Sequence, residues 1–245
     1  MKKILLLVTL FLTIGLEAET IKADYKVEFG IFGEIGIANA VLEKGDNSYV
    51  IDVELEATGL AKTLSGGRTE HHISKGHMEN GVMVTDLYQV IKSSGSKTTN
   101  KVYRVNHETK VVTKEYKRWK NAKLVKDTNS TLDFYSKDDL LTLYFNLNHK
   151  IEDKTKSDNY SFSAVGAEKQ NGNVEIAIPE KSEYNEYKES VGESNDSWYA
   201  RAIIHQDIFS SDKGELMLRI GNDGVTEKAV LKDLIFFGDI RAKRI

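Results

Sequence analysis

Alternation of apolar and polar residues with a period of two dominates the chain after its first eighteen residues. In Tyr25–Phe29 and Tyr49–Ala57, apolar side chains fall on one parity and charged side chains on the other. This pattern predicts strands with one face in the core and one face in water. Further segments with this pattern are predicted to be strands: Ile35–Leu42, Val82–Ile91, Lys101–Asn106, Lys110–Trp119, Tyr160–Glu168, Val174–Ile178, Trp198–Asp207, Glu215–Gly221 and Thr226–Gly238.

Short turn sequences separate many of these segments. They contain residues that readily adopt positive φ, which tight hairpins require. Strands joined by such turns pair antiparallel with their neighbours in sequence. The turns are predicted at Gly45-Asp46-Asn47, Asn80-Gly81, Ser94-Gly95, Asn171-Gly172 and Asn222-Asp223-Gly224.

Two stretches depart from the alternation. Leucine and tyrosine recur at helical spacing between Leu140 and Leu147, and the acidic residues before them suit a first turn with Ser136 as N-cap. This predicts one helix of about three turns, and Leu60–Leu64 predicts a further single turn. No repeat or shift of composition marks a domain boundary. The sequence therefore predicts one mainly β domain over residues 19–245, a strongly curved antiparallel sheet or an open barrel or sandwich with one packed α-helix.

The first eighteen residues have the features of a signal peptide. Lys2 and Lys3 give a positive start, Ile4–Leu16 is mostly apolar, and Ala18 is a small residue at the predicted cleavage site. The apolar run is shorter than the roughly 20 residues that span a bilayer as a helix. We therefore expect cleavage and export to the periplasm, with no transmembrane span in the mature chain; an uncleaved N-terminal anchor is the alternative.

Composition removes several classes of protein and site. The chain has no cysteine, so a disulfide framework, a thiolate metal site and a cysteine nucleophile are excluded. It carries 34 basic and 37 acidic residues, and this near-neutral balance argues against nucleic-acid binding.

Motifs for catalysis or cofactor binding are not apparent. His71, His72 and His77 cluster in the sequence, but adjacent residues of a strand point to opposite faces, so His71 and His72 do not converge on one ion. The acids of Tyr49–Ala57 form a flat row, which is typical of a solvated strand face. The chain lacks a Gly-x-Ser-x-Gly nucleophile elbow and a Walker loop. We predict no catalytic residue, metal ligand or cofactor.

Charge is distributed unevenly along the chain. Lys101–Lys126 has a large excess of basic residues, whereas Glu180–Asp196 is acidic, and the two regions are free to meet each other or outside partners. A hairpin of Lys101–Asn106 and Lys110–Trp119 would present a basic and aromatic contact surface. The alternative is a solvated hairpin whose lysines protect a sheet edge. The candidate contact residues are Lys101, Arg104, Lys114, Tyr116, Lys117, Arg118, Trp119 and Lys120.

Asn129 and Asn195 share a short pattern. Each lies in an acid-x-Asn-x-Ser/Thr sequence without proline, which resembles the acceptor motif of asparagine glycosylation in Campylobacter-like bacteria. The large excess of lysine over arginine also fits an AT-rich genome of that kind. We predict that both asparagines lie on the surface and are glycosylation sites.

Several segments together resemble one bacterial family. They are Tyr25–Ala40, Tyr49–Ala61, Ile73–Gly76, Asn80-Gly81 with the residues up to Tyr88, and Leu234–Ile240. Their glycines and apolar alternation resemble the exported domain-of-unknown-function family 3108 of Gram-negative bacteria. Members typically have a proline after the Asn-Gly region, where this chain has Thr85. The resemblance implies a periplasmic antiparallel fold like an open barrel, and it brings no catalytic residues.

Three functions remain open at this point. The first is a non-enzymatic binding protein that holds a lipid or other apolar ligand on its curved sheet, with lining residues among Phe29, Ile31, Phe32, Leu143, Tyr144 and Phe145. The second is a structural or assembly component of an envelope machine, such as a flagellar motor or a secretion-system scaffold. The third, ranked last, is an enzyme that acts on envelope polymers. An apolar cavity would favour the first, whereas a filled core would not.

Overall fold

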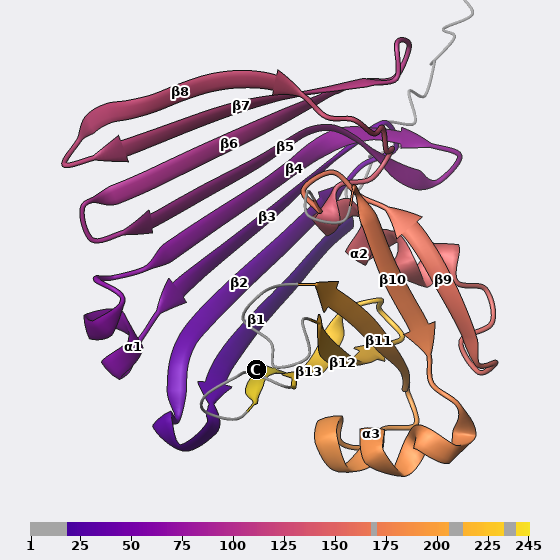
Figure 1. Ribbon diagram of the computed structural model, residues 1–245. Helices are drawn as coiled ribbons and strands as arrows, with labels where there is room; N and C mark the ends of the chain where they lie inside the picture. The colour runs from indigo at the N-terminus through magenta and orange to yellow at the C-terminus, as the bar shows by residue number, and fades with distance from the viewer. Residues whose placement is uncertain (1–18, 168–170, 206–212, 233–238) are drawn as a thin grey trace, which may run out of the picture.

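The computed structural model describes residues 19–167, 171–205, 213–232 and 239–245 (Figure 1). The predicted signal peptide lies outside these residues, so its cleavage and the export of the chain stay predictions.

One antiparallel sheet contains every named strand. It has 14 strands in the order β8-β7-β6-β5-β4-β3-β2-β1-β14-β13-β12-β11-β10-β9, so the first strand pairs with the last. This confirms the predicted mainly β, antiparallel fold. The strands are β1 Glu19–Phe29, β2 Glu34–Lys44, β3 Ser48–Ala57, β4 Thr69–Glu79, β5 Val82–Ser94, β6 Lys97–Asn106, β7 Val111–Lys120, β8 Lys123–Thr131, β9 Asp158–Ser163, β10 Asn173–Ile178, β11 Ser197–His205, β12 Lys213–Gly221, β13 Thr226–Leu231 and β14 Ile240–Arg244.

Three strands were not predicted, and the strand predicted over Tyr160–Glu168 was too long, because β9 ends at Ser163. Strand β13 ends at Leu231 and β11 at His205; the ends of the predictions that reach Gly238 and Asp207 lie outside the described residues. The unpredicted strands β4, β8 and β14 are rich in polar residues. Strand β8 has no buried residue along its length, and its two apolar residues, Leu124 and Val125, are adjacent and do not alternate with polar ones. It is recognised only by its hydrogen bonds to β7 at the edge of the sheet.

Three α-helices occur in the described part of the chain: α1 Gly59–Leu64, α2 Leu140–Lys150 and α3 Tyr184–Val191. The prediction of α2 and of the turn at α1 is confirmed, but the prediction of a single packed helix is wrong. The buried side chains of α3, Tyr187 and Val191, pack against Met217 and Val230. Because α3 lies in an acidic segment with few apolar residues, its sequence showed little helical pattern.

The N-cap of α2 is Asp139 and not the predicted Ser136. The Asp139 carboxylate accepts hydrogen bonds from the backbone N–H groups of Leu141 and Thr142. The hydroxyl of Ser136 instead donates to the carbonyl of Ser163. It also accepts from the backbone N–H of Asp138, so Ser136 stabilises the approach to the helix.

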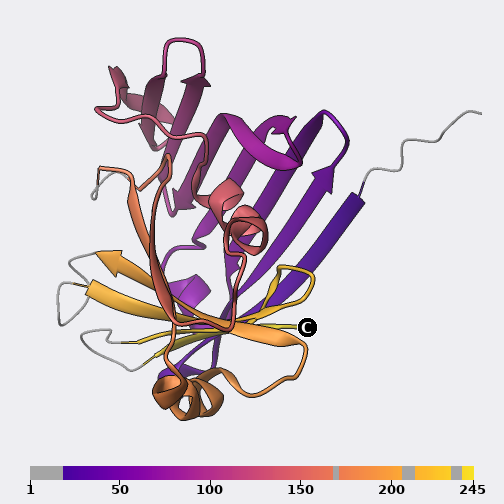
Figure 2. The same ribbon diagram turned by 90° about the vertical axis from the view of Figure 1, so that its right-hand side faces the viewer.

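The sheet bends into two arms that enclose α2. Figure 2 shows β1–β8 as one arm and the strands from β9 to β14 as the other, with α2 between them and α3 outside. We call the side that contacts α2 the inner face and the opposite side the outer face. Leu143 and Leu147 of α2, with Ile151 directly after the helix, pack against inner-face residues of β10–β12. Inner-face residues of β5, β6 and β7 form a second core around Tyr88 and Tyr103.

Candidate functional site

A cavity of about 700 Å³ lies between α2 and the inner faces of the two arms. Its volume falls within the roughly 300–1,000 Å³ typical of small-molecule sites. The inner core is therefore not filled, which is the outcome that favours a binding protein. Much of the lining is apolar and comes from both arms and the helix, including Val90, Leu140, Leu147, Val174, Ile176 and Leu218.

Two of the residues expected to line an apolar space, Leu143 and Tyr144, lie in the wall of this cavity. Phe145 instead packs with the core around Leu42 and Tyr49. Phe29 and Phe32 stack on each other with ring centres 5.8 Å apart at the end of β1. The side chain of Ile31 lies outside the description.

A chain of polar side chains crosses the cavity wall from Tyr88 to Glu70. The hydroxyl of Tyr88 lies 3.0 Å from Nδ1 of His72, and Nε2 of the same ring lies 3.1 Å from the Glu70 carboxylate. Burial, together with the negative charges of Asp139 and Glu70, raises the pKa of Tyr88. Burial also acts to raise the pKa of Glu70, but hydrogen bonds from His72, Lys92 and Arg68 outweigh it and hold that pKa well below its usual range. The raised pKa of Tyr88 favours its protonated hydroxyl, which is the form that hydrogen-bonds to His72.

The predicted hairpin of β6 and β7 forms, and its register divides the candidate contact residues between the two faces. Lys101 lies opposite Tyr116, and Lys114 lies opposite Tyr103. Tyr103 is buried on the inner face, and cross-strand partners share a face. Alternation then places Arg118 and Lys120 on the inner face with Lys101, Lys114 and Tyr116. The other candidates, Arg104, Lys117 and Trp119, lie on the outer face.

Basic charge is concentrated on the inner face of β5–β8. From Tyr88 onward, the described inner-face positions of these strands include no carboxylate, whereas the outer face has Glu115 and Asp127 beside Arg104 and Lys117. A surface of one sign beside an apolar cavity attracts ligands of the opposite charge. We call this surface the basic face; it comprises Lys92, Lys97, Lys101, Lys114, Arg118, Lys120, Lys123 and Lys126.

Several of these cations lie close to one another across the strands. Lys97 lies opposite Lys120, which in turn lies opposite Lys123. Like charges directly opposite each other in a sheet are destabilising. Nζ of Lys126 lies 5.2 Å from the ring centre of Tyr116, so an aromatic ring also forms part of this surface. An anionic ligand would relieve the repulsion.

The acidic segment Glu180–Asp196 does not lie on this surface. Its helix α3 packs on β12 and β13 from the outer side of the sheet. Its described ion pairs join it to residues other than those of the basic face: Arg201 with Glu183 at 3.6 Å, Lys232 with Glu186 at 2.6 Å and Lys188 with Glu193 at 2.6 Å. The basic face and the acidic helix α3 therefore lie on opposite sides of the sheet.

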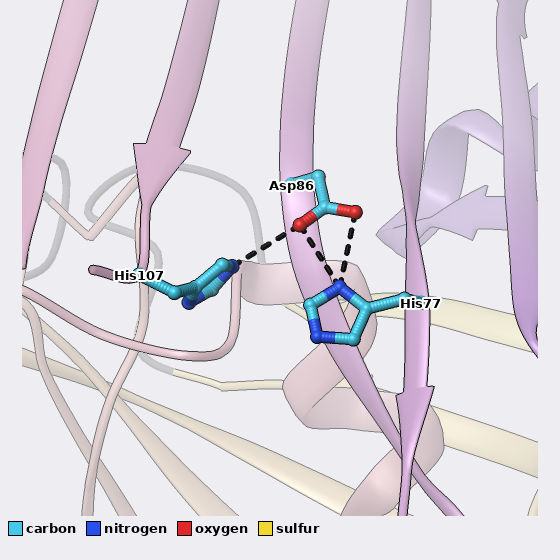
Figure 3. A group of neighbouring side chains, drawn as sticks. All are labelled: His77, Asp86 and His107. Atoms are coloured by element: carbon cyan, nitrogen blue, oxygen red, sulfur yellow. Dashed lines mark hydrogen bonds and ion pairs between the residues drawn. The ribbon is translucent and has the colours of Figure 1, made fainter.

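His77, Asp86 and His107 form a separate group on the outer side (Figure 3). The fold separates the three histidines that cluster in the sequence, His71, His72 and His77. His72 faces the cavity, whereas His71 lies 2.8 Å from Asp52 on the outer face. This confirms that His71 and His72 point to opposite faces. The association of His77 with Asp86 and His107 was not predicted, because it depends on the pairing of β4, β5 and β6.

The two candidate glycosylation sites are both exposed. Asn129 lies on the edge strand β8, and Asn195 lies in the turn before β11. Their modification stays a prediction. Within the described residues, no helix is long and apolar enough to cross a membrane.

Comparison with known proteins gives a fold likeness only. No family model matches the chain, and no curated protein matches it significantly. The structure is similar to the crystal structure of a β-barrel-like protein of domain of unknown function DUF1849 from Brucella abortus, with a TM-score of 0.49 and 13% sequence identity. The match covers 94% of this chain and 96% of that chain. Membership of family 3108 thus stays a prediction.

Proposed function

We propose that this protein binds a lipid with an anionic headgroup, holding the apolar chain in the cavity and the headgroup on the basic face. The observation that carries this proposal is the continuity of the two surfaces. Lys101 and Lys92 belong to the basic face and also line the cavity, next to Thr99. Lys92 also forms an ion pair with Glu70 of β4 at 2.6 Å, so the basic side chains beyond it carry the excess positive charge. A ligand that fills the cavity therefore meets basic side chains where it emerges.

The charges and the cavity make different contributions to binding. Burial of an acyl chain contributes about 0.8 kcal/mol for each CH₂ group removed from water. The basic side chains at the rim are largely solvated, so each contributes less affinity than a buried ion pair would. They favour anionic headgroups over zwitterionic ones and increase the rate of association.

We further propose that the protein acts in the periplasm as a non-enzymatic binding protein or carrier, possessing the fold type that family 3108 implies. The largely apolar lining of the cavity supports a binding role. An assembly role in an envelope machine and an enzymatic role on envelope polymers are the competing outcomes. Lipid analysis of native protein, combined with cross-linking, distinguishes a lipid ligand from a stoichiometric protein partner.

Filling the cavity is expected to abolish the apolar part of binding. Ala202 lines the cavity from β11 and is only half-buried, so Ala202→Trp places a large ring in the space with little disturbance of the core. We expect its affinity for the neutral fluorophore N-phenyl-1-naphthylamine to fall at least about tenfold, equivalent to about 1.4 kcal/mol. The control is Thr113→Trp, on the exposed outer face of β7, which should bind as the unmodified protein does. Unchanged fluorophore binding by a folded Ala202→Trp protein would refute binding in the cavity.

Reversing charge on the inner face is expected to change headgroup preference. Lys97 and Arg118 are exposed members of the basic face, and the double variant Lys97→Glu/Arg118→Glu should bind lysophosphatidylglycerol about tenfold more weakly. Binding of lysophosphatidylcholine with the same acyl chain should be unaffected. The matched control is Arg104→Glu/Lys117→Glu, which changes the same charge on the outer face of the same strands. Equal weakening by the two double variants would show that the inner face has no special role.

A further inference from the structure

We infer that His77, Asp86 and His107 form a binding site for a divalent transition-metal ion. The site lies outside the lipid cavity, where β4, β5 and the turn after β6 meet on the outer side of the sheet (Figure 3). It is independent of the proposed function, because no residue of the group lines the cavity.

The three side chains place their ligand atoms close together. Nδ1 of His77 lies 3.0 and 3.1 Å from the two carboxylate oxygens of Asp86, and Nε2 of His107 lies 3.2 Å from one of them. All three ligand atoms lie within 4.8 Å of one another. Two imidazole nitrogens with one carboxylate oxygen suit Zn²⁺, Co²⁺ or Ni²⁺ better than Ca²⁺ or Mg²⁺, which prefer oxygen ligands alone.

A β-bulge directs Asp86 toward the two histidines. Gly76 lies opposite Thr85, whereas Lys75 lies opposite Leu87, so Asp86 has no partner of its own in the β4–β5 ladder. Bulges of this kind re-aim a side chain and are frequent next to functional sites. Because the bulge and both strands belong to the sheet, the separation of His77 and Asp86 is set by backbone pairing.

Further contacts hold the ring of His107 in the orientation that metal binding requires. Its Nδ1 lies 2.9 Å from the hydroxyl of Tyr135, and its Nε2 lies 2.9 Å from the carbonyl oxygen of Thr85. Without an ion, Nε2–H donates to the carbonyl and Nδ1 accepts from the tyrosine. With an ion at Nε2, the proton resides on Nδ1 and is donated to the tyrosine oxygen, as in other histidine metal sites. The ring keeps its place, and the Thr85 carbonyl is available as a fourth ligand.

A second group of possible ligands gives an internal comparison. Asp52, Glu54 and His71 also lie within 4.8 Å of one another, but they contain a single imidazole and lie along one flat strand pair. The group at His77 has two imidazoles that approach one carboxylate from different elements. Convergence of ligands from several directions is what a metal ion requires, so we assign the site to His77, Asp86 and His107.

Metal titration of the untagged, chelator-treated protein tests the assignment. Calorimetry with Zn²⁺ and Ni²⁺ should show one site per chain, Co²⁺ should give visible absorption bands, and the melting temperature should rise with metal. Ca²⁺ and Mg²⁺ should give no shift. Each of His77→Ala, Asp86→Ala and His107→Ala should weaken binding at least about tenfold, because each removes one ligand.

His71→Ala and His149→Ala are the controls, since both remove a histidine elsewhere and should leave the affinity unchanged. The altered residues in the site are at least partly exposed, so circular dichroism should show folded protein for every variant. Absence of saturable binding, or a loss in His71→Ala equal to that in His77→Ala, would overturn the assignment. Lipid binding serves as a separate readout and should be the same in all these variants.

Discussion

Replacing Gly76 with alanine is expected to destabilise the protein by about 4 kcal/mol or more, a cost at the extreme of single substitutions. A Cβ atom at this position would lie 1.8 Å from the backbone carbonyl oxygen of Val84 and 2.8 Å from Cε1 of Tyr49. The first contact is with backbone and is not relieved by rotating a side chain. The bulge between β4 and β5 would have to open, which also removes the support of Asp86. Urea unfolding followed by circular dichroism measures the loss.

Gly45→Ala is the matched control for this substitution. A Cβ at Gly45 would meet only the Ser48 carbonyl oxygen at 3.7 Å, which is an ordinary contact, and Gly45 does not have a positive φ. We expect its free energy of unfolding to change by less than about 1 kcal/mol. Equal stability of Gly76→Ala and Gly45→Ala would contradict the close packing of β4 against β5 at the bulge.

Replacing Asp139 with alanine is expected to lower the free energy of unfolding by about 3–5 kcal/mol. The residue is fully buried, and its carboxylate accepts from the hydroxyls of Ser74 and Thr85 at 2.5 and 2.9 Å. Burial raises the pKa of Asp139, while these hydroxyls and the backbone N–H groups of α2 act in the opposite direction. Alanine would remove both the helix cap and the acceptor of the buried hydroxyls. Thermal unfolding monitored by circular dichroism measures the effect.

Asp139→Asn separates the cap from the hydroxyl network. Asparagine is as good an N-cap as aspartate, so this variant should recover about 1 kcal/mol relative to alanine. Its amide nitrogen is a donor, and it leaves Ser74 and Thr85 without their shared acceptor. Asp133→Ala, an exposed change on the approach to α2, should alter stability by less than about 0.5 kcal/mol. Equal stability of Asp139→Ala and Asp133→Ala would contradict a role for the buried carboxylate.

The contacts of Asp139 belong to a larger set that fixes α2 over the cavity. Asn146 donates to the carbonyl oxygen of Met83 at 2.9 Å and accepts from its N–H at 3.3 Å. Lys150 forms an ion pair with buried Asp138 at 3.0 Å. These contacts join both ends of the helix to one another and to β5. The cavity is thus bounded by a helix that is already in place, which reduces the ordering cost of binding.

Thr85 connects β5 to the segment that leads into α2 through two different groups. Its backbone N–H donates to the carbonyl oxygen of Lys137 at 2.8 Å, and its hydroxyl donates to Asp139. A proline at this position would lack both groups.

Sequence periodicity was informative where one face of a strand is apolar and failed where it is not. Strand β3 alternates clearly, with Tyr49 and Ile51 buried, and it was predicted within a residue or two. Strands β4 and β8 carry many polar residues on both faces, so their sequences gave no such signal. The helix α2 was predicted from its leucines, but its cap was misplaced by three residues. Ser136 and Asp139 are both good N-cap residues, so residue type does not distinguish them. The position at which the backbone becomes helical decides which of them is the cap.

By itself, the sequence determined the antiparallel β class, the hairpin of β6 and β7, and the basic charge of that region, because these depend on residues that are near neighbours in the chain. The tertiary structure decided which lysines face the cavity, since strand register sets the face of every side chain. It also decided that His77 meets Asp86, 9 residues away, and that His107 meets the same carboxylate from 21 residues away. Those encounters depend on a bulge and on pairing across three strands, and local sequence pattern carries no information about either.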